Sequence, residues 1–145
     1  KPPEPFFIFI PGIGAHPPYG APLDYQEKFN VTEIKSNAFP LRPPNTPNKP
    51  KYHSNTIGIQ YWRNLTGFND DFFYKINAIY LGLISYMDWN FGELISAINE
   101  YDASTNTTTG VIMSSDHGDF GGDYHLVEKW PGGADDVLLR IPLVM

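Results

Sequence analysis

Three short apolar runs punctuate the chain. Residues 6–10 read Phe-Phe-Ile-Phe-Ile without a polar interruption, which is typical of a strand buried on both faces of a parallel sheet. Residues 110–115 and 141–145 have the same character. We expect each run to form a strand, and the last one continues to the final residue of the sequence.

A helical pattern lies between the first two runs. Apolar residues recur at every third or fourth position from Phe72 to Ile98, which predicts a helix over about 70–99. Asn69 is a suitable N-cap, and the acidic residues Asp70 and Asp71 favour the positive end of the helix dipole.

The remaining segments are expected to be loops. Residues 14–67 are rich in Pro, Asn and Gly, and residues 101–109 are polar. Strand, crossover with a helix, and strand is the βαβ arrangement. The sequence therefore predicts an α/β fold with a mostly parallel sheet flanked by helices, and we expect residues 1–145 to form a single incomplete domain.

Composition narrows the class of partners. Hydrophobic residues make up 41% of the 145 residues and charged residues 18%, which fits a packed core. The net charge of −6 argues against a nucleic-acid partner, although a local basic pocket for a small anion stays open. No apolar stretch is long enough to span a membrane, and the absence of cysteine excludes disulfides and thiolate metal sites within the chain. Because Lys1 leads directly into a strand pattern, we expect the chain to begin partway through a domain.

Three sequons are present, at Asn30, Asn64 and Asn106. Chance alone would supply roughly one or two in a chain so rich in Asn. Composition therefore leaves open whether they are glycosylation sites or coincidences.

Candidate chemistry follows two of the predicted strands. His16 lies in the turn after the first strand, and Asp116-His117-Gly118 comes directly after the second. Ligands of parallel α/β sheets bind beyond the carboxyl ends of the strands, so these side chains should share one edge. Asp116 and His117 could ligate a divalent cation, or Asp116 could simply cap a turn.

His125 and Lys129 lie in the loop that follows. A lysine ammonium is a compact charge suited to an oxyanion. The alternative for both residues is a surface loop with solvated charges, and the alternative for His16 is a turn histidine without a ligand.

Together these segments resemble a known family. Ser114-Ser115-Asp116-His117-Gly118-Asp119, followed by Gly122 and Lys129, is similar to the second metal-binding motif of the sulfatases. His16-Pro17-Pro18-Tyr19 resembles the His-x-Pro-Tyr turn between that family's metal half-sites. The preceding helix and Arg140-Ile141-Pro142-Leu143 fit the same order.

The resemblance implies an alkaline-phosphatase-like α/β fold and hydrolysis of sulfate esters by a formylglycine. It implies that Asp116 and His117 ligate a divalent cation, calcium with magnesium as the alternative. His16 and Lys129 would contact the sulfate as catalytic residues, and His125 would help to bind it. Family members are mostly secreted, periplasmic or lysosomal, which favours glycosylation of the sequons and a secreted or lysosomal protein.

Other parts of the family pattern are missing from the chain. The Cys or Ser followed by x-Pro-x-Arg is absent, as is the acidic pair that supplies the other metal ligands. We therefore expect this chain alone to be inactive and to need the rest of a longer polypeptide to complete the fold. A phosphoesterase or phosphonate hydrolase of the same superfamily and a non-catalytic sulfatase-like binding protein are the competing hypotheses.

Overall fold

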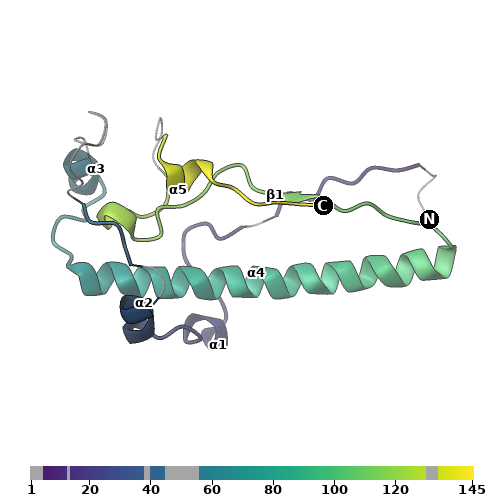
Figure 1. Ribbon diagram of the computed structural model, residues 1–145, viewed down its shortest axis with the longest axis horizontal. Helices are drawn as coiled ribbons and strands as arrows, with labels where there is room; N and C mark the ends of the chain where they lie inside the picture. Colours follow the sequence, from purple (N-terminus) through teal and green to yellow (C-terminus); the bar gives the residue numbers. More distant parts are fainter. Residues whose placement is uncertain (1–4, 13, 38–39, 45–55, 130–133) are drawn as a thin grey trace.

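A long helix, α4, runs almost the full length of the molecule (Figure 1). It covers Asp70–Thr105 and thus confirms the helix predicted over 70–99, extended at its C-terminal end. The computed structural model describes residues 5–12, 14–37, 40–44, 56–129 and 134–145. Among the helices it describes, none is both long enough and apolar enough to cross a membrane.

Both ends of α4 are capped by side chains. At the start, the Asn69 side chain accepts a hydrogen bond from the Phe72 N–H, as predicted. At the end, Asn106 adopts the left-handed conformation, with φ 52°, and its N–H donates to the Asp102 carbonyl. The Asp102 carboxylate accepts bonds from the Thr109 N–H at 2.7 Å and the Thr109 hydroxyl at 2.8 Å, so the turn after the helix is held closed.

Short helices cover one side of α4. Helices α1 (Leu23–Gln26) and α2 (Val31–Asn37) pack against it from below in the view of Figure 1, inside the segment expected to be a loop. Gly82 allows α1 to approach closely, because a Cβ at this position would collide with the Tyr25 carbonyl. The rings of Tyr25 and Tyr86 meet edge to face, with centroids 5.1 Å apart.

The opposite side of α4 carries the C-terminal third of the chain. It comprises strand β1 (Met113–Ser114), the 3-10 helix η2 (Asp123–His125), helix α5 (Asp136–Leu139) and strand β2 (Leu143–Val144). Helix α3 (Thr56–Trp62) lies near η2 and α5 at one end (Figure 1). The buried cluster in this layer consists of Phe120, Tyr124, Leu126 and Leu138, packed against Ile59 and Val137.

The sheet is much smaller than expected. Strands β1 and β2 pair antiparallel, with Met113 opposite Val144 and Ser114 opposite Leu143. They form a two-stranded sheet, and the residues that the structure describes include no parallel pair. The strands predicted over 110–115 and 141–145 are thus each formed by two residues only.

Residues 6–10 do not form the predicted buried strand. This segment lacks strand pairing and its side chains are largely exposed, with Phe7 88% and Phe9 78% accessible. A strand gains its hydrogen bonds only from a neighbour, and the described part of the chain places none beside this run. The segment is apolar, as its sequence shows, but the described residues include no strand that pairs with it and buries its side chains.

Candidate functional site

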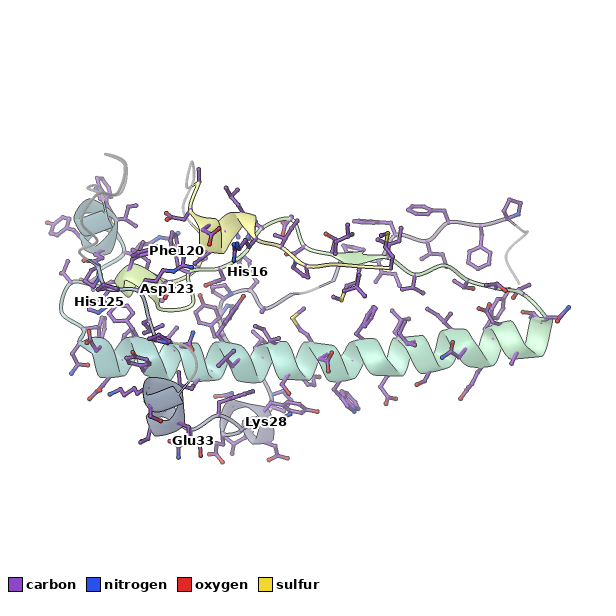
Figure 2. All side chains as sticks on the ribbon, viewed as in Figure 1. His16, Lys28, Glu33, Phe120, Asp123 and His125 are labelled. Carbon is purple, nitrogen blue, oxygen red and sulfur yellow. The ribbon has the colours of Figure 1, made fainter. Side chains whose placement is uncertain are left out.

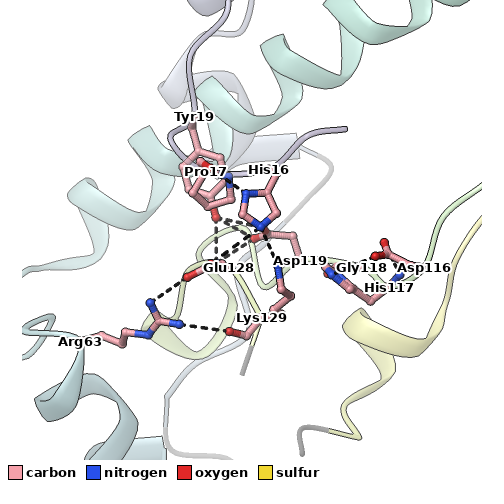
Figure 3. A network of polar contacts seen from close by, with 10 residues as sticks. All are labelled: His16, Pro17, Tyr19, Arg63, Asp116, His117, Gly118, Asp119, Glu128 and Lys129. Carbon is pink, nitrogen blue, oxygen red and sulfur yellow. Dashed lines mark hydrogen bonds and ion pairs between the residues drawn. The ribbon is translucent and has the colours of Figure 1, made fainter. Parts of the chain in front are cut away.

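His16 and Lys129 meet at the centre of a polar network (Figure 3). The Lys129 Nζ lies 2.6 Å from the His16 Nε2. His16 Nδ1 lies 2.7 Å from the Pro17 carbonyl oxygen, which can only accept, so Nδ1 carries the hydrogen. Nε2 is then an acceptor for the ammonium. The structure therefore brings together the two residues expected to contact sulfate.

Tyr19 and Asp119 tie the two segments to each other. The Tyr19 hydroxyl donates to the Asp119 carboxylate, with oxygen–oxygen distances of 2.9 and 3.1 Å, and accepts from the Glu128 N–H at 2.8 Å. Asp119 also accepts from the Gly121 N–H at 2.7 Å and from the Glu128 N–H at 3.1 Å. The turn that carries His16 is thereby fixed against the loop that carries Lys129.

Burial governs the ionisation of this network. It raises the pKa of the Tyr19 hydroxyl far above its usual range, and the neighbouring Asp119 charge adds to the effect. Burial also raises the pKa of Asp119, against the hydrogen bonds from Gly121, Tyr19 and Glu128. Tyr80, whose ring lies edge to face with that of Tyr19, has its pKa raised to about 12 by burial and by the Asp119 charge. Tyr19 consequently stays protonated, and its hydroxyl donates a hydrogen bond to Asp119.

Glu128 and Arg63 extend the network on the side of α3. Arg63 Nη1 lies 2.8 Å from Glu128 Oε2, and its Nη2 donates to the Lys129 carbonyl at 3.5 Å. Glu128 Oε1 lies 3.9 Å from His16 Nε2. The sequence assigned no role to Arg63 or Glu128, because nothing local to either residue signals a contact between segments so far apart along the chain.

Asp116 and His117 occupy the turn after β1. The His117 Nδ1 lies 2.8 Å from the Gly118 carbonyl oxygen and must donate to it, which leaves the Nε2 lone pair 3.6 Å from Asp116 Oδ2. The Gly118 N–H donates to the Leu138 carbonyl, and a Cβ on Gly118 would collide with the Val137 carbonyl. The turn is thus held tightly against α5, with the Asp116 carboxylate exposed.

The charge state of Asp116 suits a cation ligand. Desolvation by neighbouring atoms raises its pKa, but the electrostatic effect of the His117 ring when protonated, nearby backbone N–H groups and the Lys129 ammonium outweigh this, so the pKa is lowered overall. The pair supplies one nitrogen and one oxygen donor, whereas a calcium ion takes six to eight ligands. Within the described ranges no group of three or more His, Asp or Glu residues could hold a metal. Asp116 and His117 could therefore supply only one oxygen and one nitrogen donor of a cation's shell.

His125 lies apart from His16 (Figure 2). Its ring stacks on Phe73, with centroids 4.3 Å apart, and its Nε2 lies 2.7 Å from Asp70 Oδ1 at the start of α4. The structure does not bring it into the network of Figure 3.

The sequon asparagines are all on the surface. Asn30, Asn64 and Asn106 are exposed, and the last two adopt positive φ angles of 56° and 52° in turns. Their position is compatible with glycans, which require surface sites.

Comparisons with known proteins agree with the resemblance. The sulfatase family model matches residues 1–145. The chain is 28% identical over 144 residues to the sulfatase YidJ of Escherichia coli strain K12, a match that covers 98% of this chain and 26% of that protein. It is 25% identical over 151 residues to iduronate 2-sulfatase of Mus musculus, with 98% and 26% covered.

A third relative has a broader description. The multifunctional alkaline phosphatase superfamily protein PehA of Trinickia caryophylli is 26% identical over 153 residues, covering 98% of this chain and 28% of its own. No solved structure matches. The chain spans about a quarter of the length of these curated relatives. With a family match over all its residues, the chain belongs to the sulfatase family, which implies an alkaline-phosphatase-like α/β fold.

Proposed function

We propose that residues 1–145 are an interior portion of a sulfatase catalytic domain that binds sulfate esters for hydrolysis. The observation that carries this proposal is the 2.6 Å contact between Lys129 Nζ and His16 Nε2. The formylglycine nucleophile and the remaining metal ligands would come from the rest of the polypeptide. The exposed apolar run at 6–10 supports this, because further sheet strands would bury it.

Lys129 and His16 would hold the sulfate group of the substrate. An entering sulfate oxygen takes the Lys129 donors, which frees His16 Nε2 from its bond to the ammonium. That exposed nitrogen would then take up a proton from solvent water and donate it to the ester oxygen as the alcohol leaves. Both groups would thus donate to an oxyanion whose negative charge grows during the reaction.

Asp116 and His117 would supply part of a divalent-cation site, for calcium in our proposal and magnesium as the alternative. Asp116 would contribute carboxylate oxygen, and His117 would contribute its Nε2 lone pair. A cation bound there supplies Lewis-acid stabilisation of the sulfate oxygens. The His125 ring contacts Asp70 and Phe73, so in this proposal it does not bind the sulfate. The proposed function also involves no nucleic acid.

Phosphate or phosphonate ester hydrolysis is the second candidate, favoured by the similarity to PehA. The cation at Asp116 and His117 and the Lys129 ammonium would bind the oxygens of a phosphoryl group in the same way. A sulfatase-like protein that binds sulfate esters without hydrolysing them is the third.

Initial rates of the full-length protein on a chromogenic aryl sulfate, phosphate and phosphonate separate these candidates. We expect the highest kcat/KM for the sulfate, lowered about 10²- to 10³-fold in Asp116→Ala and in Lys129→Ala. Lys75→Ala, an exposed residue of α4, is the matched control and should be unchanged. Preference for phosphate would favour the second candidate, binding without turnover the third, and full sulfatase activity in both site variants would refute the assignment.

We also propose that the protein enters the secretory route and is secreted or lysosomal. The exposure of all three sequon asparagines supports this. After expression in secreting eukaryotic cells, enzymatic removal of N-glycans should lower the apparent mass of the protein. The triple variant Asn30→Gln, Asn64→Gln, Asn106→Gln should show no such mass shift. A wild-type protein with no shift would contradict this proposal.

A further inference from the structure

We propose that Tyr19 and Asp119 are positioning residues that set the relative placement of His16 and Lys129, an inference that rests on the proposed function. They touch neither the sulfate nor the cation in this account. Their role would be to join the two loops that deliver the reacting groups. Three features of the structure carry the proposal.

The first feature is that one hydroxyl links both loops. Tyr19 belongs to the same turn as His16, and its hydroxyl accepts from the N–H of Glu128, the residue before Lys129, at 2.8 Å. The same hydroxyl donates to Asp119, which itself accepts from the Glu128 N–H at 3.1 Å. Figure 3 shows these bonds meeting between the two segments. A shift of the Tyr19 hydroxyl would therefore move His16 relative to Lys129.

The second feature is the backbone of Glu128. Its φ of 67° lies in the left-handed region, which a residue with a side chain adopts only when its surroundings impose it. Its N–H is held by Tyr19 and Asp119, its carbonyl accepts from the Phe120 N–H at 2.9 Å, and its carboxylate pairs with Arg63. Lys129 leaves the loop in a direction fixed by this conformation, so release of the Glu128 N–H would free the lysine to turn.

The third feature is burial. Tyr19 packs edge to face against the Tyr80 ring at 5.8 Å, and the Gly121 carbonyl beside Asp119 accepts from the Asn77 side chain at 2.9 Å. The pair is thus backed by α4, the longest helix among the residues that the structure describes. A hydrogen bond shielded from water in this way holds its geometry more firmly than an exposed one.

A double-mutant cycle on the full-length protein separates positioning from general support of the fold. Tyr19→Phe removes only the hydroxyl, and we expect it to lower kcat on an aryl sulfate about ten- to a hundredfold, with a smaller change in KM. In the Lys129→Ala background the same substitution should lower kcat less than about twofold, because the group it positions is gone. Tyr80→Phe, which removes a hydroxyl from the adjacent ring without touching Glu128, is the matched control and should leave kcat unchanged.

Equal losses from Tyr19→Phe in both backgrounds, or no loss in either, would overturn the positioning role while leaving the proposed function intact. Full activity in Lys129→Ala would instead refute the proposed function itself. If Tyr19→Phe does not fold, Asp119 supplies the comparison. Asp119→Asn retains an oxygen acceptor for the Tyr19 hydroxyl and should keep most of the activity, whereas Asp119→Ala should not. Equal activity of these two variants would overturn the inference.

Discussion

The Lys129 ammonium lies 2.6 Å from the His16 imidazole, although 113 positions separate the two residues along the chain. A positive group donating to the unprotonated nitrogen of a histidine is an arrangement that an anion would disrupt and replace. The contact therefore marks the place where we expect a sulfate oxygen to bind. Its consequences can be tested at several points of the molecule.

His16→Gln should slow substrates with poor leaving groups more than those with good ones. A histidine that protonates the departing oxygen matters most when that oxygen is strongly basic, and such a proton transfer contributes about 10²- to 10⁴-fold. The measurement is kcat/KM of wild type and variant across aryl sulfates of increasing phenol pKa. A constant ratio across the series would mean that His16 does not act as the acid.

Asp116→Ala should weaken the binding of calcium as well as lowering activity. Removing one oxygen ligand leaves His117 as the nearest remaining donor in the turn. Thermal unfolding of the full-length protein, followed across a calcium titration, reports the affinity without relying on turnover. We expect the midpoint concentration to rise by at least about tenfold. An unchanged midpoint would remove Asp116 from the cation site.

Two glycines of α4 should respond in opposite ways to alanine. Gly92 has open space around it, so Gly92→Ala should stabilise the helix by roughly 0.5–1 kcal/mol through propensity alone. Gly82→Ala gains the same propensity but places a Cβ against the Tyr25 carbonyl, which should cost about 1–3 kcal/mol. Chemical denaturation of both variants measures the difference. A stabilising Gly82→Ala would mean that α1 does not pack against α4 as described.

Asp102 should make the end of α4 sensitive to acid. The Thr109 hydroxyl bond lowers its pKa against partial burial, and the Thr109 N–H and Thr107 hydroxyl contribute further. A carboxyl whose folded pKa lies below its unfolded value of about 3.8 stabilises the fold fully above that pH. The contribution is then lost as pH falls through the lower folded pKa. The stability difference between wild type and Asp102→Asn should accordingly shrink in this acidic window, and a difference that is independent of pH would contradict the cap.

The sequence predicted best what depends on local chemistry. The start of α4 at Asp70 follows from the Asn69 cap and the acidic first turn. The helix was predicted to end at 99, but it continues to Thr105. Its end is set by Asn106 and by the bonds from Thr109 to the Asp102 carboxylate, which the apolar pattern does not reveal. The strand predicted at 6–10 is not formed, since apolar character indicates burial but cannot supply a neighbouring strand.

Part of the candidate site was predictable through the family motifs. His16, Asp116, His117 and Lys129 were identified from motifs, and the contact between His16 and Lys129 agrees with a shared site. Tyr19 and Asp119 stood within those motifs without being recognised. The signal that could have found them is that each is a polar residue within three positions of a motif histidine. Arg63 carried no signal at all, because its partner Glu128 is near it only in the fold.

The most direct test of the site is the energetic coupling between His16 and Lys129. If both contact one sulfate group, removing either disrupts the same interaction, and the losses should not add. The measurement is kcat/KM of the full-length protein on an aryl sulfate for His16→Ala, Lys129→Ala and the double variant. We predict that the double variant loses little more than the more damaging single change. Losses that multiply fully, as for two independent residues, would contradict a shared sulfate site.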